Sequence, residues 1–208
     1  KNIKATVSAK NKTYDGTLNA DVEAAVSASD LISGDKLEIT GITGTFAEKN
    51  AGNNKTITID SSNPKIAGTG ADNYNVIIEK PETITASINK RVVELKWNDD
   101  PTYNGTEQRL TATVSNAVSG DEFKLTYEGN TQTATGDNYI AKVTGLGNSN
   151  YTLEGAKTSE HKWSINYLNT DSVADITQKP DGSDGWFKHG ITVNAPQGYK
   201  ISEDGVNW

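Results

Sequence analysis

The stretch Lys12-Thr13-Tyr14-Asp15-Gly16-Thr17 decides the fold, because it returns 89 positions later as Pro101-Thr102-Tyr103-Asn104-Gly105-Thr106. Asp-Gly and Asn-Gly pairs favour turns whose central residues need a positive φ, which glycine adopts freely. A tyrosine just before such a turn can lay its ring on a core and keep its hydroxyl at the rim. We therefore interpret both stretches as architecture, centred on Tyr14, Asp15 and Gly16 and on Tyr103, Asn104 and Gly105.

Three further landmarks follow the tyrosine turn in the same order in both halves of the chain. They are Ser33-Gly34-Asp35 and Ser119-Gly120-Asp121, then Asn73-Tyr74 and Asn150-Tyr151, then Ser87-Ile88-Asn89 and Ser164-Ile165-Asn166. Four landmarks in one order indicate a duplication. We expect one repeat domain over residues 1–90, a second over 91–168, and a partial β-rich module over 169–208.

Alternation of apolar and polar residues predicts short strands throughout both repeats. Ile3 to Ala9 and Lys55 to Asp60 have a period of two, which is typical of half-buried strands. The Ala-rich stretch Asp21 to Ala28 alternates as well, but it could form a short helix on propensity alone. The expected fold is mostly β, with small antiparallel domains in tandem. Each is either an immunoglobulin-like sandwich or a compact β-grasp-like sheet with one short helix near Asp21 to Leu31.

The junctions between the predicted domains differ in character. Only Asn89-Lys90-Arg91 separates Ile88 from Val92, so the last strand of one repeat should lead almost directly into the next repeat, as a semi-rigid connection joined end to end. After Leu168 a different sequence begins, and about forty residues are too few for an independent sandwich. That piece is either part of a third domain or packs on the second repeat.

Composition excludes several classes of function. The 208 residues carry a net charge of -7, and no basic stripe suits a nucleic acid or an anionic membrane. No apolar run approaches the length of a membrane span. The absence of cysteine excludes disulfides, thiolate metal sites and cysteine nucleophiles. The chain does not start with Met, so we expect a fragment of a longer chain. We also expect this fragment to be monomeric.

Residues 12 to 90 resemble the YDG repeat of bacterial surface and adhesin proteins. The likeness rests on the tyrosine turn, Ser33-Gly34-Asp35, Gly44 to Gly52, Lys55-Thr56-Ile57, Asp72-Asn73-Tyr74 and Ile84 to Ile88. The second repeat resembles the related MBG-type repeat but lacks a counterpart of Thr45-Phe46-Ala47-Glu48-Lys49. Residues 181 to 208 are similar to the opening of a bacterial immunoglobulin-like surface module. The resemblance implies a tandem stalk or adhesive array outside a bacterial cell and carries over no catalytic residue.

Few residues suggest catalytic or metal chemistry. His161 and His189 have no second ligand at metal spacing, and no serine lies in a Gly-x-Ser-x-Gly elbow. Nothing in the sequence demands an enzyme, which would need a cleft with converging titratable groups. We expect no cofactor, although acidic pairs could supply oxygen ligands to calcium. Those pairs are Asp99-Asp100 and Asp181 with Asp184; the alternative is a solvated acidic turn at each place.

Four tryptophans raise the question of ligand binding, because sugar rings stack on exposed flat aromatics. Trp97 and Trp163 lie on the alternating faces that carry Leu95 and Ile165, so we expect both in a core. Trp186 and Trp208 remain as candidate ligand-stacking residues. Two functions stay open: a non-catalytic stalk or spacer of a bacterial cell-surface protein, or an adhesive module that binds a host glycan or surface protein through such aromatics or a free strand edge.

Overall fold

The structure is a computed structural model that describes residues 1–81 and 83–166. The described chain is mostly β, which confirms the predicted fold class. It divides into two compact units. The first comprises Lys1–Glu94, Val114–Leu125 and Gly145–Lys157, and thus includes two segments of the second repeat. The second comprises the remaining described residues, 95–113, 126–144 and 158–166.

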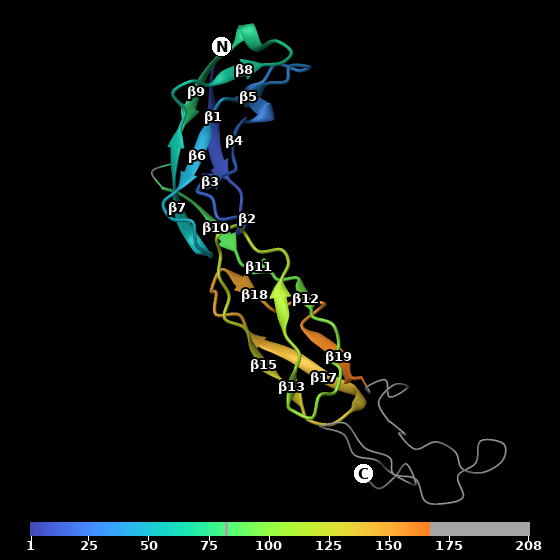
Figure 1. Cartoon of the computed structure of the whole chain (residues 1–208). Helices are drawn as coiled ribbons and strands as arrows, with labels where there is room; N and C mark the ends of the chain where they lie inside the picture. The colour runs from blue at the N-terminus through green and yellow to red at the C-terminus, as the bar shows by residue number, and fades with distance from the viewer. Residues whose placement is uncertain (82, 167–208) are drawn as a thin grey trace, which may run out of the picture. The chain divides into compact units, whose positions relative to one another are not determined.

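A three-stranded sheet of the first unit has β1 (Asn2–Ala9) at its centre. Its neighbours are β4 (Val22–Val26), which is antiparallel, and β9 (Asn75–Glu79), which is parallel. Figure 1 shows these three strands side by side. In β1 every second residue is buried, as the alternation in the sequence predicts. The sheet therefore has one face toward the core.

A five-stranded sheet of the same unit supplies the other face of the core. Its order is β2 (Lys12–Thr13), β10 (Ile84–Asn89), β7 (Gly52–Asp60), β6 (Thr43–Phe46) and β3 (Asn19–Ala20). Burial also alternates along β10, and β10 contacts β1, so the two sheets form a two-layer sandwich. The buried side chains of the first repeat are Ile3, Ala5, Val7, Tyr14, Phe46, Ile57, Tyr74, Ile84, Ala86 and Ile88.

Two further two-stranded sheets belong to the first unit. β5 (Glu38–Thr40) pairs with β8 (Lys65–Ala67), and β11 (Arg91–Val92) pairs with β18 (Tyr151–Thr152). Three of the pairs are parallel, namely β1 with β9, β2 with β10 and β11 with β18. The three-stranded and five-stranded sheets are therefore mixed, whereas sequence alternation suggested antiparallel domains.

The Ala-rich stretch resolves in favour of a strand. β4 occupies Val22–Val26, and the helical alternative near Asp21 to Leu31 is reduced to a single 3-10 turn, η1 (Ala28–Asp30). Pairing of β4 with β1 satisfies its backbone along five residue pairs, which outweighs the helix propensity of alanine. A second 3-10 turn, η2 (Ala71–Asn73), precedes Tyr74.

The second unit is built from short ladders around one small core. β12 (Leu95–Trp97) pairs with β14 (Ala112–Val114), and β13 (Gln108–Arg109) pairs with β16 (Thr131–Gln132). β17 (Gly136–Gly145) lies between β15 (Thr126–Glu128) and β19 (Glu160–Ile165). The core residues are Leu110, Ala141, Trp163 and Ile165, with Trp97, Tyr103 and Tyr139 packed against them.

The two described tryptophans differ in burial. Trp163 is 1% exposed, which confirms its predicted place in a core. Trp97 is half-buried at the edge of that core, where its Nε1 donates to the carbonyl of Thr158 at 2.9 Å and its ring stacks on His161. No helix among the described residues is long and apolar enough to cross a bilayer.

Candidate functional site

The first tyrosine turn has the geometry that its sequence predicts. Asp15 Oδ1 accepts from both the backbone N and the Oγ1 of Thr17, each at 2.9 Å, and Gly16 has a φ of 78°. Lys12 Nζ donates to the same carboxylate oxygen at 2.8 Å. Burial acts to raise the pKa of Asp15, but the hydrogen bonds from Lys12 and Thr17 outweigh it, so this pKa lies below its usual value.

The second tyrosine turn repeats this arrangement with asparagine in place of aspartate. Asn104 Oδ1 accepts from the N and the Oγ1 of Thr106 at 3.0 and 2.7 Å, and Gly105 has a φ of 83°. Each turn is also tied to the closing Ser-Ile-Asn strand of its own repeat. Tyr14 N donates to the carbonyl of Asn89, and Tyr103 N donates to that of Asn166, both at 2.9 Å.

The Ser-Gly-Asp landmark of the first repeat forms a turn that holds a tyrosine. Asp35 N donates to the carbonyl of Ile32 at 2.9 Å, and Gly34 at the third position has a φ of 97°, as a type II turn requires. The hydroxyl of Tyr74 donates to Asp35 Oδ2 at 2.7 Å and accepts from Ile32 N at 2.7 Å. Two landmarks that are 39 residues apart in the sequence therefore form one structural element.

The second Ser-Gly-Asp turn binds its own tyrosine in the same way. Asp121 N donates to the carbonyl of Val118 at 3.0 Å, and Gly120 has a φ of 88°. The hydroxyl of Tyr151 donates to Asp121 Oδ2 and accepts from Val118 N, at 2.7 and 2.8 Å. The ring of Tyr151 lies edge-on to Phe123, with centroids 4.8 Å apart.

A second tyrosine reaches this carboxylate, and it comes from the first tyrosine turn. The hydroxyl of Tyr14 donates to Asp121 Oδ1 at 3.2 Å, and its ring lies edge-on to that of Tyr151 at 5.5 Å. We call Tyr14, Asp121 and Tyr151 the tyrosine–aspartate cluster; all three residues belong to the first unit. Tyr14 is 1% exposed. Burial, with the adjacent carboxylate of Asp121, raises the pKa of both tyrosines.

Neighbouring groups fix the position of the cluster. Asn150 Oδ1 accepts from Ala51 N at 2.9 Å, and its Nδ2 donates to Asn50 Oδ1 at 3.2 Å. A Cβ placed on Gly16 would lie 2.7 Å from Cγ1 of Val118. The close approach of Gly16 to Val118 requires a residue without a side chain, and the positive φ requires glycine for a second reason.

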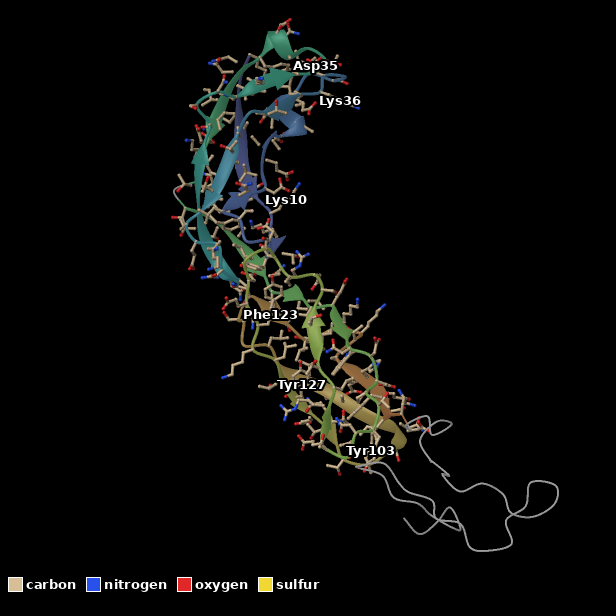
Figure 2. The ribbon with its side chains drawn as sticks, in the orientation of Figure 1. Lys10, Asp35, Lys36, Tyr103, Phe123 and Tyr127 are labelled. Carbon is tan, nitrogen blue, oxygen red and sulfur yellow. The ribbon has the colours of Figure 1, made fainter. Side chains whose placement is uncertain are left out.

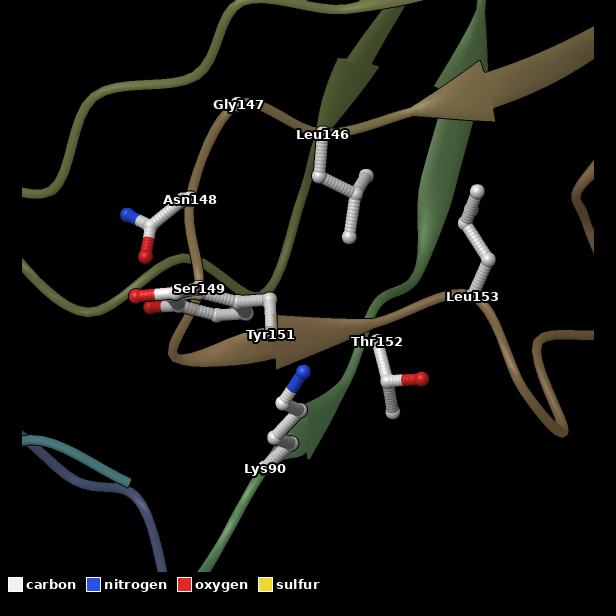
Figure 3. A pocket seen from close by; sticks show the side chains of 8 residues that line it. All are labelled: Lys90, Leu146, Gly147, Asn148, Ser149, Tyr151, Thr152 and Leu153. Carbon is white, nitrogen blue, oxygen red and sulfur yellow. The ribbon is translucent and has the colours of Figure 1, made fainter. Parts of the chain in front are cut away.

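A shallow pocket lies beside the cluster in the first unit. It has a volume of about 480 Å³ and is lined by Lys90, Leu146, Gly147, Asn148, Ser149, Tyr151, Thr152 and Leu153 (Figure 3). The hydroxyl of Tyr151 is bound to Asp121, and Asn148 donates to the carbonyl of Glu122 at 3.1 Å. Lys90 is the one charged residue of this lining. The pocket therefore offers an ammonium group without a converging acid or base.

Metal ligands do not converge within residues 1–81 and 83–166, where no group of three His, Cys, Asp or Glu could hold a metal ion. Asp100 Oδ1 is buried and has no hydrogen-bond partner among the described residues. Several residues singled out from the sequence lie outside the described residues. They are Asp181, Asp184, Trp186, His189 and Trp208.

The structure thus brings some predicted residues together and leaves others apart. Tyr14 and Tyr151, which sequence analysis treated as separate landmarks, share the carboxylate of Asp121, whereas Tyr103 packs on the core of the second unit. Asp35 and Asp121 were not among the predicted site residues. The signal that could have found them was present, because the Ser-Gly-Asp and Asn-Tyr landmarks occur as a pair in both repeats.

Comparison with known proteins places a family on the first repeat. Residues 1–86 match the family model described as the YDG domain, in agreement with the resemblance drawn from the sequence. The match ends before the second repeat. No curated protein and no solved structure matches this chain.

Proposed function

We propose, from the YDG domain over residues 1–86, that this chain is a non-catalytic structural repeat region, a stalk or spacer, of a bacterial cell-surface, adhesin-like protein. In this proposal the region lies outside the cell and holds another part of its parent protein away from the surface. The second repeat serves as an MBG-like copy of the first, and residues 169–208 belong to an immunoglobulin-like module that follows.

One observation carries the proposal: in both repeats the aspartate of the Ser-Gly-Asp landmark and the tyrosine of the Asn-Tyr landmark are hydrogen-bonded to each other. Each Ser-Gly-Asp carboxylate accepts from the tyrosine of its own repeat at 2.7 Å. Each tyrosine turn is closed on its own Asn or Asp oxygen. Residues whose polar atoms are satisfied internally stabilise a fold, while a binding or catalytic site needs polar groups directed at a ligand.

The test is a binding screen of the full chain against glycans and host-matrix proteins. Trp186→Ala and Trp208→Ala are screened alongside, with Lys90→Ala as the variant for the shallow pocket. We expect no specific, saturable binding by any of the four proteins. Saturable binding that one of these substitutions abolishes would overturn the spacer function and establish the alternative, an adhesive module for a host glycan or surface protein.

A further inference from the structure

The chain contains two copies of the aspartate and its own-repeat tyrosine, Asp121 with Tyr151 and Asp35 with Tyr74. Asp121 receives one hydroxyl on each carboxylate oxygen, Tyr151 on Oδ2 and Tyr14 on Oδ1. Asp35 receives Tyr74 on Oδ2 in the same geometry, but no donor in the described part of the chain reaches its Oδ1. The first Ser-Gly-Asp turn thus has the bond between Asp35 and the tyrosine of its own repeat, Tyr74. It lacks a second tyrosine in the position that Tyr14 occupies at Asp121.

The apolar contact beside the carboxylate shows the same difference. Val118 is half-buried, and its Cγ1 lies against Gly16 of the incoming turn. Ile32 holds the matching place before the first Ser-Gly-Asp turn, and it is 57% exposed. Ile32 is thus a largely exposed aliphatic side chain next to a carboxylate oxygen, Asp35 Oδ1, that accepts no hydrogen bond from the described residues.

The asparagine that precedes the tyrosine in each repeat shows the same difference between the two repeats. Asn150 binds Asn50 and Ala51 of the first repeat through its side-chain amide. Its counterpart Asn73 is exposed, and its side chain has no partner within residues 1–81 and 83–166. Three elements of one contact, a carboxylate, an aliphatic side chain and an amide, are therefore open together on the first repeat.

The backbone register indicates what would approach this surface. Arg91 N donates to the carbonyl of Asn150, and Lys1 N donates to that of Asn73, so Lys1 stands in the first repeat where Arg91 stands in the second. The residues just before Arg91 are the closing strand of a repeat whose turn docks at Asp121. A repeat leading directly into Lys1 would present its own turn at Asp35, which Figure 2 shows beside Lys36.

We propose that Ile32, Asp35 and Asn73 form a docking surface for the Tyr-Asp-Gly turn of a preceding repeat of the same kind, joined through its Ser-Ile-Asn strand to Lys1. The tyrosine hydroxyl donates to Asp35 Oδ1, and the glycine packs on Ile32. A short covalent connection raises the effective concentration of the turn to the millimolar range, so a contact of a few side chains forms without high intrinsic affinity. This inference holds for a spacer and for an adhesive module alike.

The test compares the full chain with an extended chain that carries a second copy of residues 1–90 directly before Lys1. Hydrogen exchange of residues 31–36 should be slower by about tenfold or more in the extended chain, because a hydrogen bond to a charged group and an apolar contact are added. Tyr14→Phe in the added copy should remove much of this protection. The same substitution in the original copy measures the equivalent bond to Asp121 and serves as the reference.

A second measurement uses one substitution in two contexts. Ile32→Ala should change the unfolding equilibrium constant of the original chain by about fivefold or less, since more than half of the side chain is exposed, but by a clearly larger factor in the extended chain. Ile77→Ala, at an isoleucine that is 47% exposed in β9, is the matched control and should behave alike in both. Equal exchange of residues 31–36 in the two chains, or an Ile32→Ala effect independent of the added repeat, would overturn the docking surface, whatever the binding screen finds.

Discussion

Replacing Tyr151 with phenylalanine tests the tyrosine–aspartate cluster most directly. The ring stays, so the edge-on contacts with Phe123 and Tyr14 are retained. The hydroxyl is lost, and with it the 2.7 Å bond to Asp121 and the 2.8 Å bond from Val118 N. The substitution therefore isolates two hydrogen bonds from the packing around them.

The expected loss of stability follows from these two bonds. A hydrogen bond to a charged group contributes about 1.5–3 kcal/mol, and a backbone N–H left without a partner costs about 1–3 kcal/mol. Val118 is half-buried, so water can reach part of the space that the hydroxyl leaves. The cost of the unpaired Val118 N–H should therefore be near the lower end of its range, about 1 kcal/mol. Tyr151→Phe should then lower the free energy of unfolding of the first unit by about 2–4 kcal/mol.

The assay is hydrogen exchange of the full chain, read in peptides that cover residues 114–125 and 145–157. Tryptophan fluorescence does not report directly on this unit, because the two described tryptophans, Trp97 and Trp163, both lie in the second unit. Tyr139→Phe, read in peptides that cover residues 126–144 of the second unit, is the control. The hydroxyl of Tyr139 donates to the carbonyl of Ala134 at 3.1 Å, a neutral acceptor, so the expected loss in free energy of unfolding is about 0.5–1.5 kcal/mol. If Tyr151→Phe costs no more than Tyr139→Phe, the shared carboxylate does not stabilise the first unit.

Three further outcomes are expected. Gly16→Ala and Gly105→Ala should each lower the free energy of unfolding by about 1–2 kcal/mol, because alanine is strained at a positive φ. In urea unfolding Gly16→Ala should lower it further, because the new Cβ would lie 2.7 Å from a methyl of Val118, whereas Gly105 has open space around it. Equal losses in the two variants would show that the first turn does not dock on Val118. Because the pKa values of Tyr14 and Tyr151 are raised in the folded chain, the stability that these hydroxyls contribute is complete below the usual tyrosine pKa of 10.0 and is lost as pH rises through the folded-state values. Tyrosinate absorbance of these two residues should therefore rise together with unfolding. Ionisation of Tyr14 and Tyr151 at their usual pKa, with the chain still folded, would contradict this. Trp163→Ala should cost about 3–5 kcal/mol by circular dichroism, and a loss under about 1 kcal/mol would show that this core is not closed.

The elements that local chemistry controls were predictable from the sequence. Both tyrosine turns need glycine at a positive φ, and both have it. The alternation of Ile3 to Ala9 gave the correct face of β1, since a strand with one buried face must alternate. Trp163 was predicted in a core for the same reason. Each of these inferences depends on residues that are neighbours in the sequence.

The pairings between distant segments could not be predicted in this way. Tyr14 was expected to keep its hydroxyl at a rim, but that hydroxyl binds a carboxylate 107 residues away, and no local pattern encodes such a distance. Similarly, alternation identifies β1 and β9 as strands but is the same for parallel and antiparallel neighbours. The Ser119-Gly120-Asp121 landmark forms its turn whether or not a second tyrosine arrives, so the sequence around Asp121 does not indicate the bond to Tyr14.

The parallel pairs of the first repeat have a mechanical consequence. The chain enters this repeat through β1 and leaves it through β10, and each of these strands is bonded to a parallel neighbour, β9 and β2 respectively. When Lys1 and Asn89 are pulled apart, the bonds of a parallel pair are sheared together and share the force. Bonds at the open end of an antiparallel hairpin instead break one after another. Extension of the first repeat through its terminal strands thus loads several hydrogen bonds of each parallel pair at once.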